Sequence, residues 1–280
     1  MNSMCSDPVR LRMKGLSVLG LLIGISALAT GAEPAWKAML TPAVMGPHPR
    51  LVPTAIEMKL GWKNTVDAGK LRIEFGVPKT GKSGVMVIKS SASSHGAAAA
   101  FFPYRSNYWC ELHSGSLRPR FFQSSEWDGE ESVTTTVRYL PDRVEVNEST
   151  SVLKTGATTK EDHVFRFAPT FDLFSAMLHV RSQSLTKGER VVLVMQPFKT
   201  PYLLEVESHG SEMHEGRKAI RLSLKMRKID RGTLELKPYK KLKAAVTLWL
   251  TDDADRVPLE IRAPVFIGDV RATLVRTDRL

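Results

Sequence analysis

The segment KLRIEFGVPKTGKSGVMVIKS, residues 70–90, decides the fold, because it contains a nucleotide-binding pattern between two strand-like flanks. Its middle, GVPKTGKS, matches the phosphate-loop pattern G-x-x-x-x-G-K-[ST] through Gly76, Gly81, Lys82 and Ser83. A functional phosphate loop follows a strand buried on both faces and precedes a helix whose N-terminus holds the phosphates. The flanking residues therefore decide between an NTPase and an antiparallel β protein.

Both flanks of this loop predict antiparallel strands. Apolar and polar residues alternate over residues 70–77, which is typical of a strand with one wet face, and residues 85–88 are rich in β-branched side chains. Pro78 and Gly81 are then turn residues of a hairpin. We therefore interpret the match as chance and expect no nucleotide and no other cofactor. The stretch AVTLWLTDD, residues 245–253, resembles a magnesium-binding strand but predicts a strand that enters an acidic turn.

The same alternation recurs along the chain, for example in AIRLSLKMR, residues 219–227. About a dozen short strands predict a mainly β fold, namely a curved antiparallel sheet or open half-barrel with one or two short helices on its concave side. One helix is expected around residues 97–111. The other is expected over residues 171–183, with Asp172 as N-cap, and its apolar stripe would pack on the sheet or form a lid; the stripe consists of Leu173, Ala176, Met177 and Val180.

The N-terminus predicts export. An apolar run at residues 16–29 follows Arg10, Arg12 and Lys14 and precedes small residues that end at Ala32. This pattern is typical of a secretory signal peptide over residues 1–32, cleaved near Ala32, and it predicts a location in the periplasm or cell envelope. Translation could start at Met1 or at Met13.

After the leader, we expect two parts. Residues 33–53 are rich in proline and predict a linker or a surface strap. Residues 54–280 are long enough for a single β-rich domain with a sizeable core. Cys110 is the one cysteine outside the leader, and its aromatic surroundings in the sequence predict a buried thiol.

The chain is basic, with a formal net charge of +11. The leader contributes three basic residues and one acidic residue, so removing it leaves +9. Basic proteins attract anionic partners, and the densest run, residues 225–243, suggests anionic lipid headgroups or an acidic glycan, or else simply the wet face of a sheet. Nucleic acid is not expected for an exported protein, and the oligomeric state stays open.

Catalytic and metal patterns are weak. His209, Glu212 and His214 match no metal-binding spacing and predict a hairpin turn, so no metal is expected. Asp252 and Asp253 lie in a second predicted turn, where carboxylates accept backbone N–H bonds and Arg256 would screen them. The alternative is a glycan hydrolase that uses Asp252 or Asp253.

Three stretches carry a resemblance to a known family. They are residues 171–189, residues 246–261 and residues 265–274, and their distinctive positions are Trp249, Asp252, Asp253, Arg256, Pro258 and Gly268. They resemble domain of unknown function 3108, a family of exported bacterial proteins. Residues 68–77 and 108–123 fit the family more loosely. The resemblance implies a β-rich fold similar to the half-barrels of LolA-type lipoprotein carriers, and it assigns no catalytic residues.

The leading hypothesis is an exported, non-catalytic protein that binds or carries an apolar or amphiphilic molecule of the envelope. The alternative is a structural or glycan-binding envelope factor, and the hydrolase is less favoured. An apolar cavity of a few hundred Å³ would favour the carrier. A filled core would favour the alternative, and convergent carboxylates in a cleft would favour the enzyme.

Overall fold

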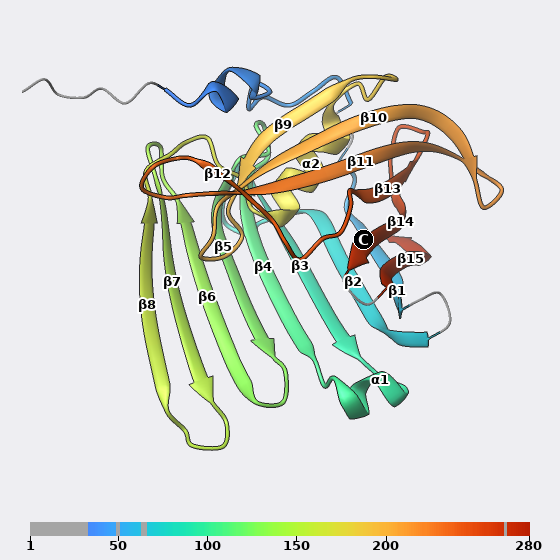
Figure 1. Ribbon diagram of the computed structural model, residues 1–280. Coiled ribbons are helices and arrows are strands. Elements are labelled where there is room, and N and C mark those ends of the chain that lie inside the picture. The colour runs from blue at the N-terminus through green and yellow to red at the C-terminus, as the bar shows by residue number, and fades with distance from the viewer. Residues whose placement is uncertain (1–32, 49–50, 63–65, 266–267) are drawn as a thin grey trace, which may run out of the picture. The chain divides into compact units, whose positions relative to one another are not determined.

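A computed structural model describes residues 33–48, 51–62, 66–265 and 268–280. From Pro34 onward these residues form one compact unit. Most of them belong to a single antiparallel sheet of fifteen strands (Figure 1). Within the described part of the chain, no helix is both long and apolar enough to cross a membrane. The predicted signal peptide, residues 1–32, lies outside the described residues.

The strands are short to medium in length and follow one another at close spacing. Their bounds are β1 Thr54–Trp62, β2 Val66–Pro78, β3 Val85–Ser94, β4 Arg105–His113, β5 Pro119–Trp127, β6 Glu131–Tyr139, β7 Val144–Val152, β8 Thr158–Phe165, β9 Arg190–Met195, β10 Tyr202–His214, β11 Arg217–Ile229, β12 Leu236–Pro238, β13 Val246–Thr251, β14 Pro258–Val265 and β15 Gly268–Arg279.

The strand order shows an open sheet. The order is β8-β7-β6-β5-β4-β3-β2-β1-β15-β14-β13-β11-β10-β9, with β12 paired to β11 off this path. Thus β1 to β8 form a meander from hairpin to hairpin, and β1 also pairs with the last strand, β15. β8 and β9 end the order, so the sheet does not close on itself. The mainly β, antiparallel and open fold predicted from the sequence is confirmed.

The GVPKTGKS segment is the hairpin between β2 and β3, as predicted. In β2, Ile73 and Phe75 are buried, whereas Arg72 and Glu74 on the other face are half-buried. Gly76 has φ +81° at a register shift of the β2–β3 ladder, which is typical of a β-bulge. A Cβ at this position would lie 3.1 Å from the main chain of Val52, so the backbone itself requires glycine here.

The helices differ in part from those predicted. Helix α2, Leu173–Ser182, lies where it was expected, and Asp172 caps it by accepting hydrogen bonds from the N–H groups of Phe174 and Ser175. The helix predicted around residues 97–111 was wrong for most of its length. Only α1, Gly96–Phe101, is helical, and strand β4 begins at Arg105. The alanine run is the part that forms the helix, whereas the aromatic residues after Pro103 pair with β3 and β5 as a strand.

The predicted stripe of α2 was also wrong in part, because Leu173 is 43% exposed. The helix is instead buried on two sides. Phe174 contacts Tyr108 of β4 and Phe122 of β5, with ring centroids 5.9 and 6.3 Å apart. Ala176 and Val180 pack with residues of β9 to β13, among them Leu193, Leu222 and Leu248. Both halves of the sheet therefore turn the same face toward α2, and we call it the inner face.

Residues 34–48 lie against the domain. Trp36, in the short 3-10 helix Ala35–Met39, is 5% exposed and packs on Phe167 with ring centroids 5.3 Å apart. Its Nε1 donates to the carbonyl oxygen of Leu234. The Thr41 N–H donates to the carbonyl oxygen of Val192, on the edge strand β9. The segment predicted as linker or strap therefore contributes one residue to the core.

Candidate functional site

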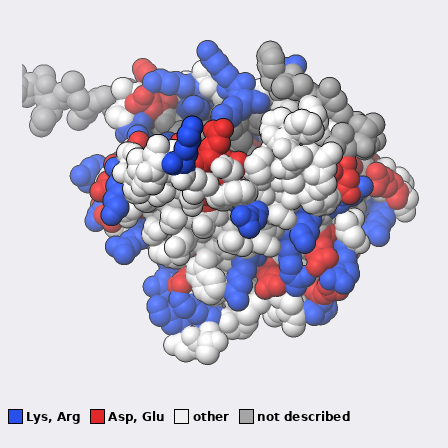
Figure 2. Space-filling model, turned by 90° about the horizontal axis from the view of Figure 1, so that it is seen from below, with Lys and Arg blue, Asp and Glu red and all other residues white. Residues whose placement is uncertain are grey.

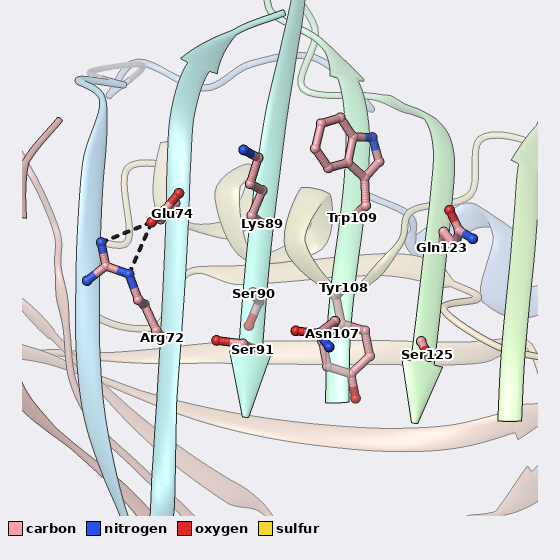
Figure 3. A pocket seen from close by; sticks show the side chains of 10 residues that line it. All are labelled: Arg72, Glu74, Lys89, Ser90, Ser91, Asn107, Tyr108, Trp109, Gln123 and Ser125. Atoms are coloured by element: carbon pink, nitrogen blue, oxygen red, sulfur yellow. Dashed lines mark hydrogen bonds and ion pairs between the residues drawn. The ribbon is translucent and has the colours of Figure 1, made fainter. Parts of the chain in front are cut away.

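Two adjoining hollows cross the outer face of strands β1 to β5, opposite the inner face. Their volumes are about 400 and 340 Å³, and they share Arg72, Ser91 and Asn107. We call them together the outer groove; the side chains that matter for its chemistry are Lys70, Arg72, Lys89, Arg105, Asn107, Trp109, Gln123 and Ser125. Figure 3 shows the larger hollow, in which the side chains come from neighbouring strands; among them are Arg72, Lys89, Asn107, Trp109, Gln123 and Ser125.

Strand pairing sets the positions of these side chains. Trp109 of β4 lies directly between Lys89 of β3 and Gln123 of β5 in the ladder. One row along, Asn107 lies between Ser91 and Ser125. The residues that alternate with them point inward and are fully buried; they are Ile88, Cys110 and Phe122. The strands that form the bottom of the groove are thus fixed from the inner face by a packed core.

The carboxylates at the groove are paired to arginine. Arg72 donates to Glu57 Oε1 at 2.7 Å and to Glu74 Oε1 at 2.9 Å. Arg276 adds a second bond to Glu57 at 2.9 Å. The hydrogen bond from Arg72 is the largest cause that lowers the pKa of Glu57, which therefore stays ionised. Lys70, Lys89 and Arg105 give the groove its excess of positive charge.

Two cations of this face lie over indole rings. The Nζ of Lys89 is 5.4 Å from the ring centroid of Trp109, and the guanidinium carbon of Arg105 is 4.4 Å from that of Trp127. Each pair joins residues that are opposite each other on adjacent strands. Indole faces, amides and cations can together bind a sugar ring and a nearby acidic group. No residue of the groove was singled out from the sequence, although strand alternation predicts its outward side.

The phosphate-loop residues form an exposed turn. Gly81 has φ +73°, Lys82 and Ser83 are exposed, and the Lys82 N–H donates to the carbonyl oxygen of Lys79 within the turn. A surface hollow of about 650 Å³ lies beside the turn. Strand β3 follows at Val85, where a phosphate loop would begin a helix. The local structure is therefore that of a hairpin loop.

In the acidic turn between β13 and β14, Asp253 accepts main-chain hydrogen bonds, as the sequence predicts. Its Oδ1 accepts from Thr251 Oγ1 at 2.8 Å and from the N–H groups of Asp255 and Arg256 at 2.9 Å each. Trp249, just before the turn, is 7% exposed, which confirms the predicted burial. The turn leads into the buried Pro258 at the start of β14, and Gly268 begins the next strand.

Asp252 bonds to a different part of the sheet. Its Oδ2 accepts from Ser211 Oγ at 2.6 Å and pairs with Lys218 Nζ at 2.9 Å. The hydrogen bond from Ser211, followed by that from Lys218, lowers the pKa of Asp252. Asp252 and Asp253 therefore each hold a separate set of intramolecular partners.

In the described part of the chain, the Arg256 guanidinium forms no ion pair with Asp252 or Asp253. Its main-chain N–H bonds to Asp253, and its charge helps to lower the pKa of Asp252, which is the screening expected from the sequence. Arg256 is 5% exposed and points to the C-terminal end of α2. There it donates to the carbonyl oxygens of Arg181 at 2.8 Å and Ser184 at 2.7 Å, and also to that of Gln183. The carbonyl oxygens at the end of a helix have no partner inside it and favour a nearby cation, so the guanidinium satisfies them here.

The histidines of the β10–β11 hairpin have separate partners. His209 Nε2 lies 2.6 Å from Ser223 Oγ, whereas His214 Nε2 lies 3.0 Å from Oε2 of Glu260 in β14. Glu212 accepts from Trp249 Nε1 at 2.8 Å. The three residues singled out from the sequence thus form no common site. Glu260 was missed, since its proximity to His214 depends on the order of the sheet, in which β13 and β11 lie between β14 and β10.

Cys110 is fully buried, as predicted. Its Sγ donates to Asp172 Oδ2 at 3.1 Å, and burial raises the pKa of the thiol well above its usual value. A protonated thiol is a poor nucleophile, so its role here is to complete the cap of α2.

The basic run at residues 225–243 contains internal ion pairs. Arg227 pairs with Glu205 at 2.6 Å, and Lys237 pairs with Asp230 at 2.6 Å. Figure 2 shows another face of the molecule, where basic and acidic side chains are interspersed around uncharged surface. On that face the positive charge of the chain is not gathered into one continuous patch.

The structure belongs to the class of open antiparallel sheets that wrap around one helix. The family follows from the sequence. Residues 56–275 match the family model described as Protein of unknown function (DUF3108), and the chain belongs to this family. The resemblance found in the sequence is thereby confirmed. Among curated proteins none matches the chain.

Two solved structures are similar to the chain at low sequence identity. One is a β-barrel-like protein of domain of unknown function DUF1849 from Brucella abortus, with 8% identity and a TM-score of 0.49 over 82% of this chain and 99% of that one. The other is a candidate exported protein with a YmcC-like fold from Bacteroides fragilis, with 7% identity and a TM-score of 0.33 over 84% of this chain and 99% of that one.

Proposed function

We propose that the protein is an exported, non-catalytic factor of the cell envelope that binds an acidic glycan in the outer groove. The observation that carries this proposal is the combination of Trp109, two amide side chains and several cations along the two adjoining hollows of the outer groove. Asn107 and Gln123 each offer a donor and an acceptor, which suits sugar hydroxyl groups. Lys89 and Arg105 would pair with the carboxylate or phosphate groups of the glycan.

The form of the groove supports a chain-like ligand. The two hollows adjoin across five strands, and their shared residues, such as Asn107, would contact neighbouring sugar units. The paired carboxylates Glu57 and Glu74 do not cancel the remaining cations, since Arg72 and Arg276 already neutralise them. An acidic polymer is therefore favoured over a neutral one.

Export is supported by the sequence. The apolar run at residues 16–29, the basic residues before it and the small residues up to Ala32 are those of a cleaved leader. A net charge of +9 without the leader suits contact with the anionic polymers of an envelope.

The carrier of an apolar molecule is less well supported. It requires open apolar space, but α2 and aromatic side chains occupy the inner face. Phe122 contacts Phe174 at 6.3 Å and Phe198 at 5.9 Å between ring centroids. The hydrolase is also less well supported, because Asp252 and Asp253 accept hydrogen bonds from their own fold.

The test measures binding of the purified protein to polygalacturonate and to neutral dextran by biolayer interferometry. We expect binding to the acidic polymer only, and weaker binding at higher salt. Lys89→Glu should weaken it about tenfold, equivalent to about 1.4 kcal/mol, through loss of one attraction and gain of a repulsion. Trp109→Ala should weaken it as well.

Lys160→Glu is the matched control, because Lys160 is also an exposed strand lysine but lies on β8, outside the groove. Equal binding of both polymers, or equal affinity of Lys89→Glu and Lys160→Glu, would reject the proposal. An amphiphile that co-purifies with the protein in native mass spectrometry would favour the carrier instead.

A further inference from the structure

A cluster of metal-ligating side chains lies away from the outer groove, where the β10–β11 hairpin meets β14. His214 ends β10, Glu215 follows in the hairpin turn, and Glu260 lies in β14. One ligand atom from each of the three lies within 4.8 Å of the others. We propose that His214, Glu215 and Glu260 bind one divalent transition-metal ion of the Zn²⁺ type. This site is independent of the proposed glycan binding.

The distances suit such an ion. In tetrahedral zinc sites the bonds to nitrogen and oxygen are about 2.0–2.1 Å, which places neighbouring ligand atoms about 3.3 Å apart. His214 Nε2 and Glu260 Oε2 are 3.0 Å apart, so the ion replaces a hydrogen bond with little movement. Three protein ligands leave one position for water, as in open zinc sites.

Glu215 can complete the site because of its turn. Its φ of 49° and that of Gly216, 76°, fit a two-residue hairpin turn, which places the Glu215 side chain beside the end of β10. Glu215 is exposed, so its carboxylate is free to rotate toward the ion at small cost. The other two ligands are already fixed.

The surroundings hold the imidazole in place. The His214 ring stacks on the indole of Trp249, with centroids 4.2 Å apart and planes 10° apart. The indole is itself anchored, since Trp249 Nε1 donates to Glu212. These contacts hold the imidazole in a fixed orientation, as a pre-organised metal site requires.

Glu260 is held with one oxygen directed at the site. It is 1% exposed, and its Oε1 accepts from Arg262 Nε at 2.9 Å, which leaves Oε2 for His214 or the ion. Arg271, the other nearby arginine, pairs with Asp269 at 2.5 Å. Arg271 Nε also lies 4.0 Å from Oε1 of Glu260, the same oxygen that Arg262 bonds, and Glu215 adds a negative charge that favours a cation.

The test is titration of the purified, metal-stripped protein with Zn²⁺ in a calorimeter and with Co²⁺ by fluorescence. We expect one ion per chain. Bound Co²⁺ should quench Trp249, because this indole stacks on the ligating imidazole. His214→Ala and Glu215→Gln should each weaken binding at least about tenfold. Glu215→Gln changes an exposed turn residue, so its result is interpretable even if His214→Ala folds poorly.

His209→Ala is the matched control, since His209 lies on the same strand but bonds to Ser223. It should bind Zn²⁺ like the parent chain. The proposal is overturned if the parent chain binds no ion at millimolar Zn²⁺. It is equally overturned if Glu215→Gln and His209→Ala bind with the same affinity.

Discussion

The guanidinium of Arg256 donates a 2.8 Å hydrogen bond to the main-chain carbonyl oxygen of Arg181, 75 positions earlier in the chain. A second bond, of 2.7 Å, reaches the carbonyl oxygen of Ser184. The last carbonyls of a helix have no partner inside it, and a cation there also interacts well with the helix dipole. The β13–β14 turn therefore acts as the C-terminal cap of α2.

Replacing this arginine should be costly. For Arg256→Met we expect a loss of about 2–4 kcal/mol in the free energy of unfolding, because one buried and two partly buried carbonyl groups lose their donor. Urea denaturation measures the loss, and amide exchange should rise first in α2. Arg231→Met, at an exposed position, is the control and should change little. If the two variants were equally stable, the capping role would be wrong.

The two aspartates of the turn should differ in stability. Asp253→Ala removes an acceptor of three hydrogen bonds and should cost about 1–2 kcal/mol. Asp252→Ala breaks only a partly exposed contact with Ser211 and Lys218 and should cost less than about 1 kcal/mol. Thermal unfolding of both variants gives the order. If Asp252→Ala instead abolished complementation of a deletion strain at undiminished stability, the hydrolase hypothesis would return.

Trp249 should contribute most to stability among the positions that carry the family resemblance. It is 7% exposed and packs with the buried Ala219 and Leu259. Trp249→Ala should cost about 3–5 kcal/mol. Trp249→Phe should cost less, because it retains an aromatic ring against His214. Denaturant titration compares the two variants, and Trp109→Ala, at a half-buried position, is the control. If Trp249→Ala lost less free energy of unfolding than Trp109→Ala, this assignment would be contradicted.

Local patterns predicted the strands and the turns well, because alternation and turn residues act within a few positions. The β2–β3 hairpin around Gly81 and the cap of α2 by Asp172 are examples. The sequence failed where partners are distant. Nothing near Arg256 indicates that it reaches Arg181, and nothing near His214 indicates Glu260. The outer groove was missed for the same reason, since its residues come from five strands whose register depends on the whole sheet.

Stability should fall in mild acid because of His179. This histidine is fully buried in α2, neither ring nitrogen has a hydrogen-bond partner among the described residues, and burial lowers its pKa from 6.5 to about 4. Between these two values the unfolded chain binds more protons than the folded chain. His179 therefore leaves the free energy of unfolding unchanged above pH 6.5. As the pH falls toward 4, it lowers the free energy of unfolding by up to about 3 kcal/mol.

The measurement is the free energy of unfolding of the parent chain and of His179→Leu between pH 4 and pH 7.5. The slope over this range should be shallower in the variant, and the difference between the two chains isolates His179 from other titrating groups. Parallel pH profiles would show that His179 does not cause the acid sensitivity.

Lys82→Ala should leave the protein unchanged. The side chain is exposed in the β2–β3 turn, so the free energy of unfolding should shift by less than about 0.5 kcal/mol. Equilibrium dialysis with ATP should detect no binding by either form. ATP binding by the parent chain that disappears in Lys82→Ala would restore the phosphate-loop interpretation.

The pairing of β1 with β15 has a consequence for the order of folding. Thr54 lies opposite Arg279, 225 positions away, and the Leu280 N–H donates to the carbonyl oxygen of Pro53. The β1–β8 meander can form early because each of its strands pairs with a neighbour in the sequence. The β1–β15 ladder, in contrast, must close a very long loop. Until β15 has been synthesised, the chain lacks the strand that joins β1 to β14. The two halves of the sheet can therefore become one sheet only after this late strand is available.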